Sequence, residues 1–291
     1  MVRPAAVTAV IPTMDVSIVV LNYRSRALVR QCLRGVLVAQ PRCRYEVIVV
    51  DNDSGDGCLA MVAEQFPWVV RVQSPTNRGF GAGNDLGIAR ARGRYVMILN
   101  PDIALFPGQI DDLVSFMDAH PRAGVAGPRL LYPDGTAQES CRRFPSFLMP
   151  VYRRTVLGHL PGPRRQLERF LMNDFDHAEH RMVDWLMGAC LIVRRDVLEQ
   201  LGGFDEKFFL YFEDLDLCRR CWDAGWQVWY VASASPVHYH QRLSAGDGVS
   251  ALFKPAAWQH LRSAVRYYRK YASMPLPAAS PSGLDSRRPS A

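Results

Sequence analysis

Continuous apolar runs alternate with helical periodicity over the first hundred residues of the chain. Residues 16–21 and 45–50 are β-branched and apolar on both faces, which is typical of parallel strands buried on both sides. Residues 27–39, between them, repeat apolar side chains at helical spacing. This order forms a β-α-β unit, and further strands at 69–73 and 95–99 continue it. The pattern therefore predicts an α/β protein with a doubly wound, mostly parallel sheet.

The second half of the chain contains a stretch without clear periodicity. We expect a helix after Pro107, a strand at 125–132, and a helix at about 213–224 that ends before Gly225. Residues 136–182 are basic and contain prolines, so short helices and a mobile loop are expected there. This stretch either contributes to ligand recognition or forms a solvated variable loop.

Composition and charge exclude several classes of protein. The 291 residues carry a formal net charge of +7 with a pI of about 9.2, so the protein attracts polyanions. Seven cysteines, an odd number scattered along a long chain, disfavour a disulfide framework and favour a reducing cytoplasm. No apolar run reaches the roughly 18 residues that a transmembrane helix needs. The sequence therefore predicts a cytoplasmic protein that does not span a membrane.

Polar clusters follow three of the predicted strands. Asp51 and Asp53 follow the second strand, a glycine-rich loop spans 77–83, and Asp102 follows the fourth strand. The carboxyl ends of parallel strands meet at one edge of the sheet, so these groups are expected to form a nucleotide pocket there. A dinucleotide-binding fold is disfavoured, because it needs G-x-G-x-x-G in the first β-α turn, and residues 22–25 read Asn-Tyr-Arg-Ser.

Asp102 and two histidines are candidates for holding a divalent cation. Asp102 directly follows a buried strand and could hold a hard cation against a diphosphate, although an aspartate here also suits a turn or a helix cap. His238 and His240 lie on one side of an extended segment, and neutral imidazole can ligate a metal. An ordinary surface or core histidine is the alternative for each of them.

An acidic cluster opens the predicted helix at 213–224. Glu213, Asp214 and Asp216 follow an aromatic stretch, so a carboxylate there could face a partly dry cavity. Burial raises the pKa of a carboxyl group and makes it a better general base. Acidic residues in a first turn also stabilise a helix through its dipole without any catalytic role. The residues alone leave both interpretations open.

Taken in order, these motifs resemble the family-2 inverting glycosyltransferases of the GT-A fold, most closely their bacterial rhamnosyltransferase-like branch. Each motif alone is weak, but their order over residues 16–244 makes chance agreement remote. The matching segments are 17–23, 49–57, 77–84, 99–103, 188–190, 203–209, 212–217 and 238–244.

The resemblance implies a site for a nucleoside-diphosphate sugar in the first half of the chain. Asp51 and Asp53 would hold the base and ribose of this donor. Asp102 and His238 would ligate Mn²⁺ or Mg²⁺, although the family's D-x-D element reads Asn-Pro-Asp here and lacks one carboxylate. The implied donor-binding residues are Asn22, Asp51, Asp53, Asn77, Gly79, Gly83, Asn84, Asn100 and Asp102.

The resemblance also implies a catalytic base in the acidic cluster. Asp214, with Glu213 beside it, would take a proton from the acceptor hydroxyl as that oxygen attacks the anomeric carbon. Attack from the face opposite the nucleotide inverts the configuration and needs no covalent intermediate. The cation would neutralise the departing diphosphate as a Lewis acid. The implied acceptor-binding residues are Trp185, Gly188, Ala189, Glu213 and Asp214.

Residues 14–245 would then form one GT-A domain. Its nucleotide-sugar-binding half would span 14–105, and its acceptor-binding and catalytic half 106–245. The expected flanking segments are a flexible N-terminal extension at 1–13, an amphipathic helical segment at 246–273 and a disordered tail at 274–291.

The implied partners are a nucleoside-diphosphate sugar, with dTDP-rhamnose as the first choice, and a glycan or lipid-linked acceptor of cell-envelope polysaccharide synthesis. No nucleic acid partner is expected. The last helix would rest on an anionic inner membrane face or pack on the catalytic domain, since Trp and Tyr suit both uses. Two alternatives remain, a sugar-phosphate nucleotidyltransferase and a non-catalytic nucleotide-sugar-binding protein. The former would need a glycine-rich loop after the first strand, which is absent.

Overall fold

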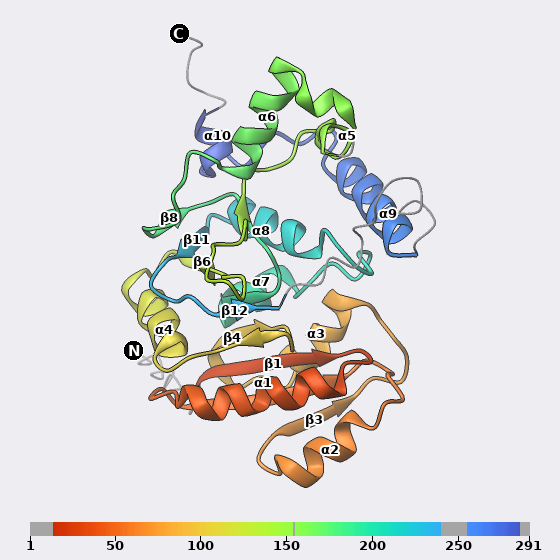
Figure 1. Ribbon diagram of the computed structural model, residues 1–291, viewed down its shortest axis with the longest axis vertical. Coiled ribbons are helices and arrows are strands. Elements are labelled where there is room, and N and C mark those ends of the chain that lie inside the picture. The colour runs from red at the N-terminus through yellow and green to blue at the C-terminus, as the bar shows by residue number, and fades with distance from the viewer. Residues whose placement is uncertain (1–13, 154, 240–254, 286–291) are drawn as a thin grey trace, which may run out of the picture.

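The computed structural model describes residues 14–153, 155–239 and 255–285 (Figure 1). The extension predicted at 1–13, the candidate metal ligand His240 and the last residues of the predicted tail lie outside the described residues.

The core of the described chain is a mixed but mostly parallel sheet with the strand order β3-β2-β1-β4-β10-β6-β11-β8. The strands from β1 to β4 pair in parallel, whereas β10 is antiparallel to both β4 and β6. The strands of this sheet are β1 (Met14–Asn22), β2 (Tyr45–Asp51), β3 (Val70–Gln73), β4 (Gly93–Leu99), β6 (Ala123–Pro128), β8 (Arg181–Met182), β10 (Cys190–Arg194) and β11 (Gln227–Val231).

Helices cover both faces of this sheet, as the sequence predicts for a doubly wound fold. One buried apolar cluster joins the sheet to α1 (Arg26–Ala39), α2 (Cys58–Gln65) and α4 (Gln109–Ala119). A second cluster on the opposite face includes residues of α7 (Arg195–Leu201) and α8 (Glu213–Asp223). The predicted α/β architecture is therefore confirmed.

The helix after the glycine-rich loop begins inside the segment predicted as loop, residues 77–83. α3 spans Phe80–Ile88, so Gly81, Gly83 and Gly87 lie inside a helix rather than in a loop. A Cβ on Gly87 would lie 2.4 Å from Val19 Cγ1, and one on Gly83 would lie 2.8 Å from Leu21 Cδ1. These glycines let α3 approach β1 closely, and this packing outweighs their low helix propensity.

The strand predicted at 125–132 ends at Pro128 in the structure. Beyond it, Leu131 pairs with a later segment instead: its amide donates to Pro236 and its carbonyl accepts from His238. A small second sheet joins β12 (Val237–His238) to β5 (Ile103–Ala104). The chain after β4 and the chain around His238 are thereby held side by side.

The aperiodic stretch at 136–182 contains short elements before β8. These elements are β7 (Cys141–Arg142), α5 (Met149–Tyr152), the 3₁₀-helix η1 (Val156–His159) and α6 (Pro161–Leu171). Of these, α5 and α6 lie at one end of the molecule (Figure 1). β7 pairs with β9 (Trp185–Leu186), which connects this end to the second half of the main sheet.

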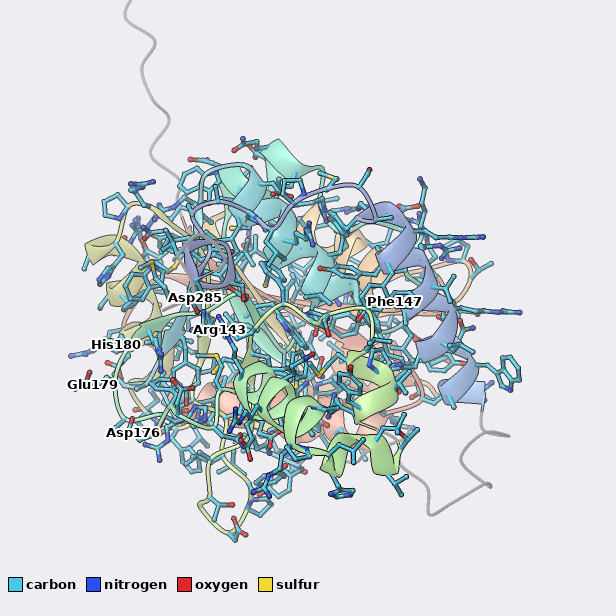
Figure 2. All side chains as sticks on the ribbon, turned by 90° about the horizontal axis from the view of Figure 1, so that it is seen from above. Arg143, Phe147, Asp176, Glu179, His180 and Asp285 are labelled. Carbon is cyan, nitrogen blue, oxygen red and sulfur yellow. The ribbon has the colours of Figure 1, made fainter. Side chains whose placement is uncertain are left out.

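The prediction of a disordered tail is wrong for residues 274–285. α9 (Pro255–Lys270) is followed by a segment that ends in α10 (Pro281–Asp285). Ser282 donates from its backbone amide and from its hydroxyl to the buried Asp184, and Asp285 lies 3.4 Å from Arg143 (Figure 2). These specific polar contacts order a stretch whose Pro, Ser and Ala composition suggests disorder.

The described helices are all too short or too polar to cross a membrane. The seven cysteines are free thiols, as expected of a chain without a disulfide framework.

Candidate active site

The turns after β1 and β2 are tied together at the carboxyl edge of the sheet. Asn22 and Asp51 are register partners at the strand ends, and both are buried. The amide of Asn22 donates to the Ser54 hydroxyl at 2.9 Å, and Asp51 Oδ1 accepts from the Ser54 backbone N–H at 3.0 Å. Asp53 is exposed, with a left-handed φ of 61°. The two predicted nucleotide carboxylates thus lie in one turn, one buried and one facing solvent.

Asn52, which the sequence analysis did not single out, fastens the glycine-rich loop to this turn. Its amide donates to Asn77 Oδ1 and to the Gly79 carbonyl, both at 2.9 Å. Its own oxygen accepts from the Arg78 backbone N–H at 3.0 Å. Asn52 lies between Asp51 and Asp53, which were predicted as binding residues because of their charge. Its place between them was the sequence feature that could have identified it.

The glycine-rich loop also contacts the second half of the chain. Gly79 has a φ of 84°, and a Cβ on it would lie 2.1 Å from the Phe209 carbonyl oxygen. That same carbonyl accepts from the Phe80 backbone N–H at 2.8 Å. The two predicted halves therefore meet directly at this loop, and only glycine allows the approach.

Asn84 is buried inside α3, and its amide donates to the Phe80 carbonyl one turn earlier. Its Oδ1 is buried and has no hydrogen-bond partner. Gly83 packs beside Asn52 and Leu21. Both residues therefore lie beside the carboxyl ends of β1 and β2, and Asn84 retains one acceptor oxygen without a hydrogen bond.

Asp102 and His238 face each other across the small second sheet. Asp102 Oδ2 lies 3.4 Å from His238 Nε2, and the Asp102 carbonyl accepts from the Tyr239 backbone N–H. His238 Nδ1 lies 2.9 Å from Gln138 Oε1. The Gln138 amide donates to the carbonyls of Leu131 and His238, which identifies its oxygen as the acceptor from Nδ1–H. In the neutral tautomer that carries this proton, the lone pair of Nε2 points toward Asp102.

The carboxylate of Asp102 and the imidazole of His238 suit a divalent cation. Asp102 Oδ1 is buried without a hydrogen-bond partner, and an imidazole whose other nitrogen is held by an amide oxygen is the usual arrangement behind a metal ligand. Within the described ranges, no group of three or more His, Cys, Asp or Glu side chains could hold a metal alone. A cation bound by Asp102 and His238 would take its remaining ligands from water and substrate phosphates, as Mg²⁺ commonly does.

Asp214 begins α8 with both carboxylate oxygens engaged by backbone amides. Oδ2 accepts from the Gly188 N–H at 2.9 Å, and Oδ1 accepts from the Leu215 N–H at 2.8 Å. A Cβ on Gly188 would lie 3.2 Å from the Asp214 Cβ, so the absence of a side chain permits this contact. Burial raises the pKa of Asp214, and the two amide hydrogen bonds oppose that rise.

Glu213 adjoins Asp214, is 5% exposed, and has a buried Oε2 without a hydrogen-bond partner. Burial, followed by repulsion from Asp214, raises the pKa of Glu213 well above its ordinary value. Tyr211 and Phe212, just before it, have φ values of 68° and 70°. Two consecutive non-glycine residues in the left-handed region store backbone strain, which is common at functional sites.

Asp102, His238 and Asp214 are linked through adjacent backbone. The Asn100 N–H donates to the Ala189 carbonyl at 2.8 Å, where the ends of β4 and β10 meet. Ala189 follows Gly188, whose N–H binds Asp214. The segments that carry the metal-binding candidates and the base candidate are therefore joined by backbone contacts where β4 ends and β10 begins.

Trp185, a predicted acceptor-binding residue, lies three residues before Gly188. Its indole N–H donates to the Arg143 carbonyl at 2.9 Å, and its ring lies 5.5 Å from the Arg142 guanidinium. Arg142 and Gln138 are functional candidates that sequence reasoning did not identify, because both lie in the aperiodic stretch.

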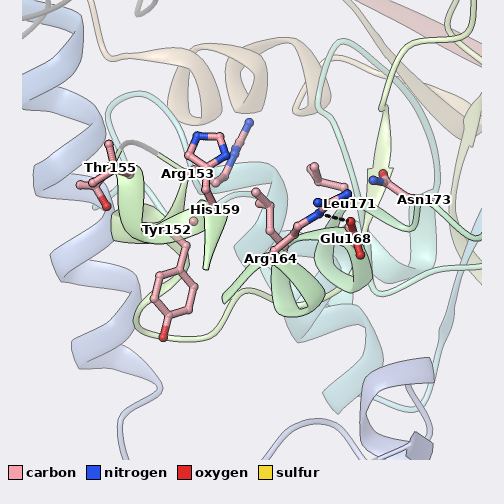
Figure 3. Close-up of a pocket in the computed structure, with 11 residues that line it drawn as sticks. Tyr152, Arg153, Thr155, His159, Arg164, Glu168, Leu171 and Asn173 are labelled. Carbon is pink, nitrogen blue, oxygen red and sulfur yellow. Dashed lines mark hydrogen bonds and ion pairs between the residues drawn. The ribbon is translucent and has the colours of Figure 1, made fainter. Parts of the chain in front are cut away.

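A separate cavity of about 560 Å³ lies among residues of α5, η1 and α6 (Figure 3). None of the predicted site residues lines it. Its lining includes exposed apolar side chains and arginines, and it is remote in sequence from the strand ends that carry the polar clusters.

Known proteins of similar fold bind nucleotides. GalNAc-T7, solved with UDP, GalNAc and Mn²⁺, is 14% identical with a TM-score of 0.62 over 88% of this chain and 48% of its own. The mannosyltransferase PcManGT from Pyrobaculum calidifontis, solved with GDP-Man and Mn²⁺, is 19% identical with a TM-score of 0.54 over 94% and 80%. At these identities the likeness concerns the fold alone, and it confirms the GT-A architecture.

Two relatives are more similar to this chain in sequence than these solved structures are. The N-acetylglucosaminyl-diphospho-decaprenol L-rhamnosyltransferase of Mycobacterium tuberculosis is 35% identical over 71% of this chain and 70% of its own. The rhamnosyltransferase WbbL of Escherichia coli K12 is 26% identical over 77% and 81%. The pattern of Glycosyl transferase family 2 matches residues 17–202. More than half of the chain thus carries the pattern, and the chain belongs to glycosyltransferase family 2.

Proposed function

We propose that this glycosyltransferase is inverting and metal-dependent, and that it transfers L-rhamnose from dTDP-rhamnose to a hydroxyl group of a lipid-linked or glycan acceptor. The relatives named as rhamnosyltransferases support the choice of sugar. The single observation that carries the mechanism is the linkage of Asp102 and His238 to Asp214 through residues 100 and 188–189.

The donor binds along the carboxyl ends of β1, β2 and β4. Asp51 and the exposed Asp53 hold the nucleoside, with Asn22 keeping their turn in place. Asp102 and His238 would hold the cation beside the donor's diphosphate, and Gln138 fixes the imidazole. When bound, the cation supplies the positive charge that neutralises the departing nucleoside diphosphate.

Asp214 takes the proton of the acceptor hydroxyl. Its carboxylate is held by two backbone N–H groups, which fixes its direction without supplying a competing acid. Its raised pKa makes it a stronger base than an exposed aspartate. Glu213 stays protonated beside it, since two adjacent buried carboxyl groups do not both ionise. Trp185 and the backbone at Gly188 and Ala189 line the acceptor side.

A panel of nucleotide sugars tests this proposal. The protein is incubated with Mn²⁺ and each donor, and slow hydrolysis and protection against thermal unfolding are measured. We expect both effects with dTDP-rhamnose, and loss of both with EDTA. Proton NMR of the transferred product gives the anomeric configuration, which is opposite to that of the donor. Protection by a nucleoside triphosphate alone, or binding of every donor without turnover, would contradict the proposal.

The proposal includes peripheral contact with an anionic membrane, because a lipid-linked acceptor lies at such a surface. On α9, Trp258, Leu261 and Val265 are each about half exposed, and arginines flank them at 262, 266 and 269. From the sequence, these apolar side chains could face either a membrane or the catalytic domain. In the structure they face outward, and α9 buries Ala264 and Tyr267 in their place.

α9 adjoins the aperiodic stretch through the Phe147 and Tyr268 rings, whose centres are 5.3 Å apart. Phe147 is 73% exposed and Val156 is 80% exposed. Apolar side chains next to arginines suit the interface of an anionic bilayer.

Sedimentation with anionic vesicles tests this contact. We expect binding that weakens with salt and that is reduced about tenfold by Trp258→Asp, since a charge replaces an inserted ring. Val38→Asp on α1 is the matched control, because Val38 is also exposed but lies on another helix. Equal binding of both variants would contradict the membrane contact.

A further inference from the structure

Arg142 is a buried cation with an incomplete set of partners. Its side chain is 13% exposed, and its Nε is buried without a hydrogen-bond partner. The nearest carboxylate, that of Glu139, lies 3.6 Å away and is itself 47% exposed. A guanidinium held away from water is costly unless an anion pairs with it closely. The Nε N–H of Arg142 could therefore donate to a further anion, beyond the carboxylate of Glu139.

Aromatic rings fix the position of this guanidinium. The Trp185 ring lies 5.5 Å from it and the Phe170 ring 5.9 Å. β7 pairs with β9 such that Arg142 and Trp185 are register partners. The indole N–H of Trp185 is held by the Arg143 carbonyl, so the ring cannot turn away. The guanidinium is thus preorganised in a place of low dielectric.

Arg142 lies on the acceptor side of the site. Its charge acts on the carboxyl of Asp214 and lowers the pKa that burial raises. It lies four positions after Gln138, which holds His238, so the two Cα atoms are at most about 14 Å apart. The donor's diphosphate is assigned to the Asp102 and His238 end. The register partner of Arg142, Trp185, lies three residues before Gly188, whose N–H binds Asp214, so an anion at Arg142 is assigned to the acceptor, as Asp214 is.

We propose that Arg142 binds a phosphate group of the acceptor and so selects acceptors whose sugar is linked through phosphate or diphosphate. This inference rests on the proposed function, because it assumes that Asp214 faces the acceptor. A guanidinium offers two parallel N–H donors that match two phosphate oxygens. A neutral glycan would offer no second anion to the guanidinium, whose Nε has no hydrogen-bond partner in the chain. The Mycobacterium tuberculosis relative is named for a diphospholipid acceptor, which fits this chemistry.

Binding of two acceptor analogues tests the proposal without requiring turnover. One is N-acetylglucosamine linked through diphosphate to a short alkyl chain, and the other is the neutral alkyl glycoside of the same sugar. Isothermal titration is performed in the presence of Mn²⁺ and dTDP. We expect the wild-type protein to bind the diphosphate analogue about 10–100-fold more tightly, the range for hydrogen bonds to a charged group.

Three variants identify the source of that preference. Arg142→Gln is expected to remove most of it while changing affinity for the neutral glycoside less than about threefold, and Arg142→Lys to retain part of it. Arg164→Gln is the matched control, because this exposed arginine on α6 loses the same charge outside the site. Thermal unfolding verifies that each variant is folded.

Equal wild-type affinity for the two analogues would overturn the proposal. So would an equal loss on both analogues in Arg142→Gln, which is the result expected if Arg142 only supports the fold or the ionisation of Asp214. In the latter case the acid limb of the rate profile would also move to higher pH. Failure of the proposed function looks different: no nucleotide sugar is hydrolysed, while the Arg142-dependent binding of the diphosphate analogue remains measurable.

Discussion

Replacing Asp214 by asparagine separates the catalytic role of this residue from its structural role. The side chain keeps its size, but it can no longer accept the proton of the acceptor hydroxyl. A positioned general base contributes about 10²–10⁴-fold to a rate, so we expect kcat to fall by about a thousandfold. Donor affinity should change less than about twofold, because Asp214 is hydrogen-bonded to the Gly188 and Leu215 backbone rather than to the turns after β1 and β2.

The cost to stability follows from the number of hydrogen-bond acceptors on the side chain at position 214. Two backbone N–H groups donate to the carboxylate, one to each oxygen, whereas asparagine has one oxygen. One N–H therefore loses its partner, which costs at most about 1–3 kcal/mol. For a chain of this size this lowers Tm by about 2–12 °C, at roughly 2–4 °C per kcal/mol. The variant should therefore remain folded at 25 °C.

The assay measures release of the nucleoside diphosphate in the presence of saturating acceptor, with donor affinity determined separately by titration. Glu213→Gln is the control, because it replaces the neighbouring carboxyl group by a neutral side chain of equal size. If Glu213 is protonated, this variant keeps its stability and most of its rate. Collapse of donor affinity in Asp214→Asn, or a thousandfold loss in Glu213→Gln alone, would refute the assignment of the base.

Three further predictions concern the residues around this base and the metal pair. Gly188→Ala places a Cβ 3.2 Å from the Asp214 Cβ, so a shift of a few tenths of an ångström should lower kcat about tenfold, and an unchanged kcat would show that the geometry is not critical. Gln138→Ala frees the His238 ring and should weaken Mn²⁺ binding about 10–100-fold in a titration, whereas unchanged affinity would remove Gln138 from the site. Asp85 has its pKa raised to about 7 by burial, so the folded state binds its proton more tightly than the unfolded state does and is more stable as pH falls from about 7 toward 4. Asp85→Asn should therefore raise Tm relative to wild type more at pH 8 than at pH 5, and an equal difference at both pH values would contradict this.

The strands at the centre of the sheet were predictable because each is buried on both faces and carries an unbroken apolar run. β1, β2 and β4 lie close to their expected positions for this reason. The start of α3 was not predictable, since the glycines that form it are individually unfavourable in a helix. Their presence is explained by contacts with Val19 and Leu21, which are more than sixty residues away in the chain.

The polar residues at the strand ends were also predictable, because residue type and position along a parallel sheet determine where they gather. Gln138 and Arg142 were not, since they lie in a stretch without periodicity and act through His238 and Trp185, about 100 and 43 residues later. The same holds for the tail, where Ser282 contacts Asp184 across 98 residues. Local sequence carries no signal for such contacts.

The central claim is that one cation, held by Asp102 and His238, joins the donor's diphosphate to a site that ends at Asp214. Crystals of the protein soaked with Mn²⁺ and dTDP test it most directly, with data collected near the manganese absorption edge. We expect an anomalous peak within bonding distance of Asp102, His238 Nε2 and the diphosphate, with Asp214 opening onto the same cavity. A peak bonded to neither residue, or a diphosphate bound elsewhere on the chain, would contradict it.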